Sequence, residues 1–199
     1  CSSDLGLDLQ MRKLIGARGA KNKGFSNWSG SVRTNPREFL QPRSIEEVSQ
    51  AVQRVGSART VGAVHSFTPV AASDGVMMNL DYLSGIVSVD RKRKRVRFLA
   101  GTRLRDVPRL LRPFGLALAN QGDVDPQSLA GAISTSTHGT GIGFTGFAGT
   151  VTGLRLVDAA GQLCSFSLDE DPEQLRLVVV SIAALGVVVE VEMQCVDDE

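Results

Sequence analysis

The chain has 199 residues, 22 Lys and Arg against 21 Asp and Glu, a formal net charge of +1 and 42% hydrophobic residues. This ordinary globular composition excludes intrinsic disorder, collagen and coiled coil, and the near-neutral charge argues against a dedicated nucleic-acid binder. The sequence contains no run of about 18 apolar residues, so it predicts no transmembrane segment. Its three cysteines show no metal-ligand spacing and no disulfide framework.

Residues 1–24 are expected to be an extra or disordered segment that contributes nothing to the fold. The chain begins with Cys1 rather than Met. Cys1-Ser2-Ser3 is compatible with a mature lipoprotein N-terminus, but residues 1–5 also match a translated sequencing adapter, which is the interpretation we favour. Met11 is then a candidate start, and a cytoplasmic location is expected.

The first folded block shows clear helix signals. Ser44 and Glu47 form a capping box, apolar residues at helical spacing predict a helix over 45–55, and Gly56 ends it. Short strands are expected at 59–62 and 75–80. This block has the pattern of a compact α/β unit.

The second block begins near Ile86 and contains mostly antiparallel hairpins. Strands are expected at 86–90 and 96–100, around five basic residues at 91–95. A nucleic-acid contact is one interpretation of this basic run, but a solvated hairpin tip is favoured. Thr102 is expected to cap a helix ending at Gly115, in which Pro108 imposes a kink or a late start. Further expected elements are a helix at 126–134, a hairpin of strands 153–158 and 162–167, a helix at 172–185 and a half-buried strand at 187–196.

Few residues offer chemistry outside the glycine-rich loops. The two histidines have no partners at zinc-ligand spacing, and no GxSxG elbow is present, so neither a metal site nor a serine hydrolase is predicted. Residues 141–146 match GxGxxG, but they follow a helix and precede a strand, which excludes the Rossmann fingerprint. Such a loop still lets backbone N–H groups approach a phosphate or a flat ring, although a plain surface loop remains an alternative.

Two histidine-centred turns, residues 61–67 and 134–141, carry a more specific signal. In each, small residues precede the histidine and Ser or Gly follows it. A buried core histidine would explain either turn alone. Their combination with the segment 120–128 between them points to one composite binding site.

These segments together resemble the FAD-binding (PCMH-type) domain of the vanillyl-alcohol-oxidase flavoproteins. Within that family, the sequence is most similar to the sugar-1,4-lactone (L-gulono and D-arabinono) and alditol oxidases and dehydrogenases. The motifs that carry the resemblance are NWSG (27–30), VGAVHSF (61–67), DGVMMNL (74–80), NQGDVDPQSLAGAISTSTHGTG (120–141) and SIAALGVVVEVE (181–192).

The resemblance implies an α+β fold in two lobes with FAD between them. A small α/β lobe would span 25–85, and a larger lobe with a mainly antiparallel sheet would span 86–199. The family's cap-like substrate domain is expected to be absent from this chain. No catalytic residue is therefore expected here, because that domain contributes the base.

The resemblance also implies site residues in the first lobe. The turn 60–66 would wrap the FAD pyrophosphate with backbone N–H groups, and His65 falls where many members bond covalently to the flavin 8α-methyl carbon. Val64 departs from the family's usual Gly, which puts the covalent bond in question. The expected contacts here are Thr60, Val61, Gly62, Ala63, Val64, His65 and Ser66.

In the second lobe, residues along the 120–141 segment would touch the pyrophosphate, the ribityl chain and the isoalloxazine. Gly122 would lie beside the flavin C4a edge, where a small residue admits oxygen without establishing oxidase activity. Gly186 and Val188 would lie near the adenine. The remaining expected contacts are Asp123, Ser128, Gly131, Thr135, His138 and Gly139.

The implied function is an FAD-dependent oxidoreductase that oxidises a CH–OH group of a sugar lactone or polyol by hydride transfer to flavin N5. Oxygen or another acceptor would then reoxidise the flavin. Two alternatives stay open: a decaprenylphosphoryl-ribose-type oxidase or epimerase, and a non-catalytic flavin-binding module. No nucleic acid and no metal is expected as a partner.

Overall fold

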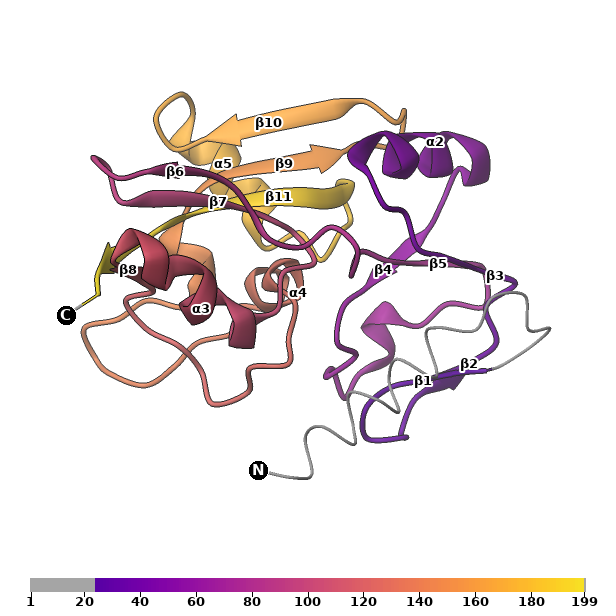
Figure 1. The fold of residues 1–199 in the computed structure, drawn as a ribbon. Coiled ribbons are helices and arrows are strands. Elements are labelled where there is room, and N and C mark those ends of the chain that lie inside the picture. Colours follow the sequence, from indigo (N-terminus) through magenta and orange to yellow (C-terminus); the bar gives the residue numbers. More distant parts are fainter. Residues whose placement is uncertain (1–23, 199) are drawn as a thin grey trace.

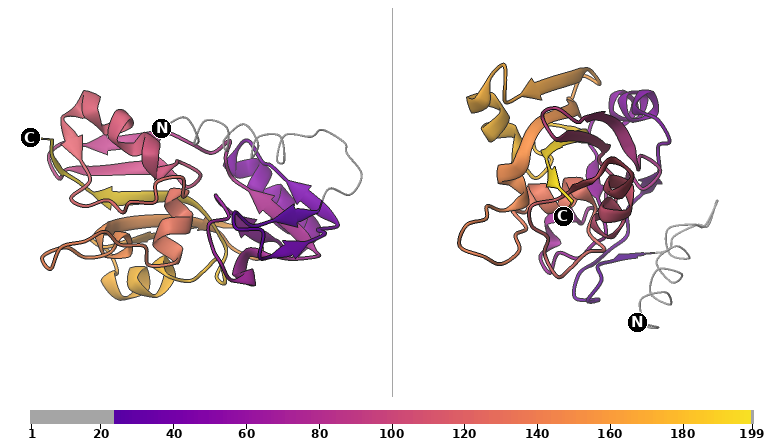
Figure 2. Two further views of the ribbon diagram at one scale, coloured as in Figure 1. Left: turned by 90° about the horizontal axis from the view of Figure 1, so that it is seen from below. Right: turned by 60° about the vertical axis from the view of Figure 1, so that its left-hand side comes forward.

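The computed structural model describes residues 24–198, so the predictions about the start of the chain, including the lipoprotein and adapter interpretations of residues 1–5, lie outside it. Two β-sheets stand side by side with helices around them (Figures 1 and 2). Residues 38–79 build a parallel sheet, and residues 86–194 build an antiparallel one. The predicted α+β class is confirmed.

The smaller sheet has three parallel strands in the order β3-β5-β4. Helix α2 (Ile45–Val55) connects β3 to β4, as parallel pairing requires. The strands are β3 (Glu38–Leu40), β4 (Arg59–Val61) and β5 (Val76–Asn79).

Both predicted ends of α2 are confirmed. The Ser44 hydroxyl accepts a hydrogen bond from the Glu47 N–H at 3.2 Å, and Gly56 follows the last turn with φ +69°. The Glu47 carboxylate accepts from the N–H of Arg43, one residue earlier than a standard capping box.

The larger sheet is antiparallel, in the order β10-β9-β11-β7-β6. Both predicted hairpins are present within it. Its core face carries Phe98, Leu154 and Val191, which are adjacent across three strands. The strands are β6 (Ile86–Asp90), β7 (Arg95–Leu99), β9 (Val151–Val157), β10 (Leu163–Ser167) and β11 (Val187–Gln194).

Two helices pack on this sheet and complete the core. Helix α4 (Leu129–Ser134) contacts β11, and helix α5 (Pro172–Val179) contacts β9 and β10. The Ser128 hydroxyl caps α4 by accepting from the Gly131 N–H at 3.3 Å.

Several very short strands were not predicted, because two or three residues carry no readable periodicity. β1 and β2 form a hairpin before the parallel sheet, and β12 pairs with β8 near the end of the described chain. Their bounds are β1 (Phe25–Ser26), β2 (Arg33–Thr34), β8 (Leu116–Ala117) and β12 (Val196–Asp197).

The predicted helix from Thr102 to Gly115 is wrong as one element. The buried Thr102 hydroxyl donates to the Leu99 carbonyl at 2.6 Å and accepts from the Gly85 N–H, so it caps no helix. Pro108 lies in the first turn of the α-helical piece, as a late start requires. The segment consists of η2 (Leu104–Asp106), α3 (Val107–Leu111) and η3 (Arg112–Phe114).

The predicted helix over 172–185 is also too long. α5 ends at Val179, and Ile182 and Ala183 then adopt positive φ values of +50° and +58°. A right-handed helix cannot continue through such residues. The apolar run that suggested a longer helix instead curls toward the parallel sheet.

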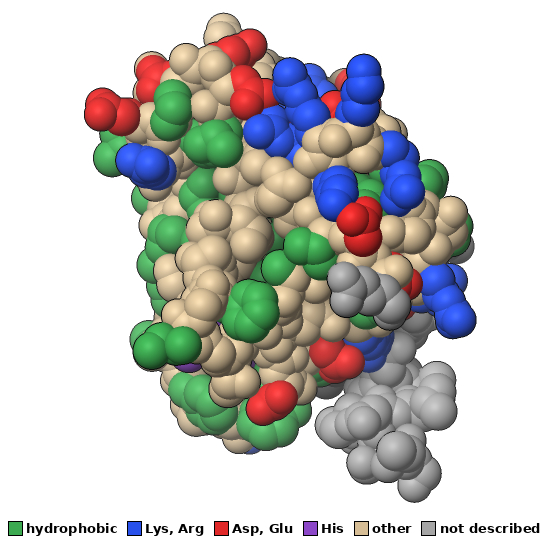
Figure 3. Space-filling model, turned by 90° about the vertical axis from the view of Figure 1, so that its left-hand side faces the viewer, with side chains coloured by type: hydrophobic (Ala, Val, Ile, Leu, Met, Phe, Trp, Pro, Cys, Tyr) green, Lys and Arg blue, Asp and Glu red, His purple; other side chains and the backbone are tan. Residues whose placement is uncertain are grey.

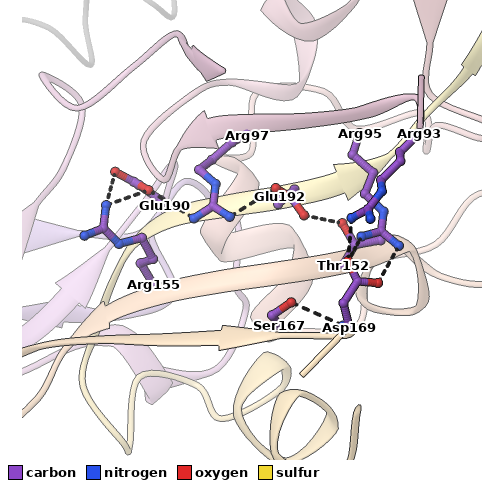
Figure 4. A network of polar contacts seen from close by, with 9 residues as sticks. All are labelled: Arg93, Arg95, Arg97, Thr152, Arg155, Ser167, Asp169, Glu190 and Glu192. Carbon is purple, nitrogen blue, oxygen red and sulfur yellow. Dashed lines mark hydrogen bonds and ion pairs between the residues drawn. The ribbon is translucent and has the colours of Figure 1, made fainter. Parts of the chain in front are cut away.

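The strand predicted at 187–196 is confirmed as β11, but the expectation that it is half-buried is wrong, because six of its eight residues are buried. The Glu190 side chain is only 5% exposed, and Arg155 bonds both of its carboxylate oxygens at 3.1 and 3.2 Å. Arg97 links Glu190 to Glu192, as Figure 4 shows. Arginines from the neighbouring strands thus bury the polar face of β11.

The basic run at 91–95 forms the turn between β6 and β7, as favoured from the sequence. Arg93 and Arg95 both bond the carboxylate of Asp169, and Lys94 pairs with Asp197. Lys, Arg, Asp and Glu side chains gather together on this side of the molecule (Figure 3). Three of the five basic residues thus share two carboxylate partners at this hairpin tip.

Candidate functional site

A cavity of about 220 Å³ lies between the two sheets. The turn after β4 forms one wall, and the first turn of α4 forms the opposite wall. Ala100 and Gly101, the pair Leu80-Asp81, and the segment before β11 complete it. Ligand pockets usually measure about 300–1,000 Å³, so this cavity suits part of a dinucleotide rather than all of it.

Gly62 sets the spacing between the two main walls. A Cβ added at Gly62 would collide with the Ser128 hydroxyl, the cap of α4. Only glycine allows the β4 turn to approach α4 this closely. The contact joins the parallel sheet to the helix that packs on the antiparallel one.

The turn leaves a row of hydrogen-bond donors without partners. Within residues 24–198, no acceptor is bonded to the backbone N–H groups of residues 63–66. Val64 in this turn has φ +53°, a conformation that β-branched residues rarely adopt. Consecutive free N–H groups beside a glycine suit an anion such as a phosphate.

His65 lines the same cavity and is half-buried. Its ring stacks on Trp28, with ring centroids 5.2 Å apart and planes 21° apart. Burial lowers the pKa of His65 below its ordinary value, and the positive charge of Arg103 lowers it further. The imidazole is therefore held neutral near pH 7, with a free electron pair on one nitrogen.

Arg103 ties the walls together behind His65. Its guanidinium pairs with the Asp81 carboxylate and donates to the Pro126 carbonyl at 3.1 Å. Asp81 lies two residues after β5, and Pro126 lies before α4. Arg103 therefore joins the segment after β5 to the segment before α4.

Gln127 lines the cavity and also carries a buried acceptor without a partner in the described part of the chain. Its Nε2 donates to Thr137 Oγ1 at 3.1 Å, but its Oε1 is buried and finds no donor among the described residues. A buried carbonyl without a partner costs about 1–3 kcal/mol, so a ligand donor there would be stabilising. Gln127, Ile182 and Ala183 line the cavity but were not predicted as contacts, because no local sequence pattern marks them.

Most of the predicted contacts come together in the cavity. The β4 turn and α4 contribute nearly all of them, and β11 contributes one. The lining includes the predicted residues Thr60, Val61, Gly62, Ala63, Val64, His65, Ser66, Ser128, Gly131, Thr135 and Val188.

Five predicted contacts do not line this cavity. Three of them form a neighbouring cluster, in which the exposed His138 ring bonds the Gly139 carbonyl at 2.9 Å through Nδ1. A Cβ on Gly122 would lie 3.2 Å from the His138 carbonyl, and one on Gly139 would lie 2.5 Å from the Gln121 carbonyl. The protein's own backbone thus requires glycine at position 139, whereas a side chain at position 122 needs only a small shift of the His138 carbonyl. The five are Gly122, Asp123, His138, Gly139 and Gly186.

Residues 24–198 hold neither a metal-binding cluster nor a membrane-spanning helix. No cluster of three or more His, Cys, Asp or Glu side chains in this range is arranged to hold a metal ion. No helix in the same range combines the length and apolar character needed to cross a membrane.

Comparison with known proteins matches residues 36–167 to the family described as FAD binding domain. The L-gulono-1,4-lactone dehydrogenase of Mycobacterium tuberculosis is 40% identical over 176 residues, covering 86% of this chain and 40% of that protein. The D-arabinono-1,4-lactone oxidase of Eremothecium gossypii is 33% identical, covering 89% of this chain and 35% of that protein. The chain thus spans about two-fifths of the length of such relatives or less.

A solved structure of alkyldihydroxyacetonephosphate synthase superposes with a TM-score of 0.75 at 17% identity. The superposition covers 84% of this chain and 33% of that one. At this level of identity the likeness concerns the fold alone.

Proposed function

This chain belongs to the FAD-binding domain family, and we propose that it holds the flavin of an enzyme that oxidises a CH–OH group of a sugar lactone or polyol. The lactone dehydrogenase and lactone oxidase among its relatives support this substrate class. When bound, FAD supplies the redox chemistry by accepting a hydride, and the protein supplies position and electrostatics. Oxygen or another acceptor would then take up the electrons.

The row of free N–H groups on residues 63–66 carries this proposal. The FAD pyrophosphate has only acceptor oxygens, so it complements these donors and the close approach that Gly62 allows. The unpaired Oε1 of Gln127 needs the opposite partner, a hydroxyl or N–H group. We therefore assign the pyrophosphate to the β4 turn and a hydroxyl of the ribityl chain to Gln127.

His65 is proposed to bond the flavin 8α-methyl carbon in place of one hydrogen, which would leave as a proton while the electron pair of the C–H bond would pass through the flavin to oxygen or another acceptor. The support is its place on the cavity wall and its lowered pKa, because only a neutral imidazole has a nitrogen free to bond carbon. Positive charge on Arg103 opposes protonation of the ring. The bond would keep the flavin in place during turnover.

The second cluster is proposed to lie along the isoalloxazine, outside the cavity of the β4 turn. Gly122, His138 and Gly139 would approach the ring, and Gly122 would leave room for oxygen. Asp123 would lie near the ribityl chain, while Gly186 and Val188 would lie near the adenine. No residue of this chain is assigned as a catalytic base.

Reconstitution with FAD tests the proposal. The purified chain should bind FAD and retain the flavin's visible colour after acid precipitation, whereas His65→Ala should bind FAD but release it into acid. Flavin that is fully extractable from wild type would contradict the covalent bond alone. Failure of the chain to bind FAD would contradict the proposal as a whole.

The substrate class needs a separate experiment on the full-length protein. Anaerobic addition of L-gulono-1,4-lactone should bleach the bound flavin, and a simple secondary alcohol should not. Equal bleaching by both compounds, or by neither, would contradict the lactone assignment.

A further inference from the structure

We infer that the β1–β2 hairpin, residues 25–34, is a clamp that positions His65, with Asn27 and Trp28 as its positioning residues. The hairpin lies before residue 36, where the match to the family model begins. The inference rests on the proposed role of His65 as a flavin contact. Its evidence is a set of contacts that converge on that histidine.

Two hydrogen bonds hold the backbone on either side of His65. The Trp28 N–H donates to the Val64 carbonyl at 3.0 Å. The Asn27 side chain donates from Nδ2 to the Ser66 carbonyl at 2.9 Å. Both neighbours of the histidine are thus tied to the same loop of the hairpin.

The Trp28 side chain supports the His65 ring itself. The indole stacks on the imidazole, and Phe67 meets the indole edge-on with centroids 6.1 Å apart. Trp28 is not among the residues that line the cavity, so it backs His65 from outside. This arrangement limits rotation of the imidazole while its other side faces the cavity.

The hairpin is rigid enough to act as a clamp. Asn27 is 8% exposed, and its Oδ1 accepts from the Val32 N–H at 3.0 Å, closing the loop. Gly30 takes the positive φ of +72° that the turn requires. At the far end, the Asp74 carboxylate accepts from Thr34 and from the Asn35 N–H.

The histidine turn needs such external support. Val64 is held in a left-handed conformation that costs about 1–2 kcal/mol for a residue with a Cβ. The free N–H groups of residues 63–66 add no internal hydrogen bonds. The hydrogen bonds from the hairpin to the Val64 and Ser66 carbonyls supply support that the turn's own N–H groups do not.

Variants of Trp28 test the clamp. Trp28→Ala removes the stacked ring, Trp28→Phe keeps an aromatic face, and Tyr82→Ala is the matched control. Tyr82 is an aromatic residue with the same 50% exposure as Trp28, but it lies against Arg43. Each variant is titrated by NMR without FAD, and FAD affinity is then measured. The chain has two histidines, so His138→Asn assigns the His65 signal.

Trp28→Ala should raise the pKa of His65 toward its ordinary value, because the ring loses its cover while Arg103, paired with Asp81, remains. FAD should bind about tenfold more weakly before any covalent bond forms, because loss of the stack with Trp28 frees His65 and the turn that would hold the pyrophosphate. Trp28→Phe should restore most of both properties, and Tyr82→Ala should match wild type.

A Trp28→Ala protein with wild-type His65 titration and wild-type FAD affinity would overturn the inference. Equal effects in Tyr82→Ala would overturn it as well. If even the wild type fails to bind FAD, the proposed function fails, but the imidazole titration still decides whether Trp28 positions His65.

Discussion

At the scale of single residues, Val64 carries backbone strain within the proposed phosphate-binding turn. Its φ of +53° favours glycine. Val64→Gly should raise the free energy of unfolding by about 0.5–1 kcal/mol, since relief of strain exceeds the added entropy of the unfolded chain. Urea denaturation measures this difference. Val124→Gly, in a loop without positive φ at that residue, should be destabilising, and a loss of stability in Val64→Gly would contradict the strain.

Gln127 leads to separate predictions for FAD affinity and for the stability of the FAD-free chain. Gln127→Leu should weaken FAD binding about tenfold, because the ligand loses an acceptor in the cavity. The FAD-free chain should keep a similar stability, because the change removes an unpaired buried carbonyl together with the hydrogen bond to Thr137. Isothermal titration and urea denaturation give the two values. Gln121→Leu, at an exposed residue nearby, is the control, and a fall in stability without a fall in affinity would contradict the assignment.

The lowered pKa of His65 predicts a dependence of stability on pH. The unfolded chain takes up a proton near the ordinary pKa of 6.5, and the folded chain does so only at lower pH. The stability of the fold with a neutral His65 is therefore fully present above pH 6.5. It is lost as pH falls through 6.5 toward the pKa of His65 in the folded chain. Urea denaturation between about pH 8 and about pH 5.5 should show this loss in wild type and less of it in His65→Asn. The same dependence of stability on pH in wild type and in His65→Asn would contradict the lowered pKa of His65.

At the scale of elements, the polar face of β11 is stabilised by ion pairs with arginines of the neighbouring strands rather than by contact with solvent. Glu190→Ala should lower the free energy of unfolding by about 2 kcal/mol, because Arg155 loses its carboxylate partner and Arg97 keeps only Glu192. Both arginines remain partly hydrated, which limits the loss. Glu38→Ala breaks an exposed pair with Arg54 and should have little effect. Similar losses in the two variants would contradict a special role for the network in Figure 4.

At the scale of the whole molecule, the cavity should couple ligand binding to global stability. Its walls come from both sheets, so bound FAD should favour the state in which they are joined. FAD at about 100 times its Kd should add about 2.7 kcal/mol, or about 5–10 °C in Tm. ADP, which offers only the pyrophosphate end, should give a smaller rise in thermal denaturation experiments. A rise with ADP equal to that with FAD would contradict contacts beyond the pyrophosphate.

The amino-acid sequence determined the features that depend on neighbouring residues. The ends of α2 followed from Ser44 and Gly56, the hairpins from alternating strands and turns, and most of the cavity lining from the motifs at 60–66 and 128–135. These signals are local, because caps and turns involve residues a few positions apart. The family resemblance added the identity of the ligand.

Tertiary structure alone decided the features that depend on which distant segments meet. Trp28 covers His65, Gln127 is left with a buried free acceptor, Glu190 is enclosed by two arginines, and residues 180–186 curl into the cavity wall instead of extending α5. The same stretch of apolar or polar residues is compatible with several local conformations. Packing against partners far away in the chain selects one of them, because the free energy of burial and pairing exceeds local preference.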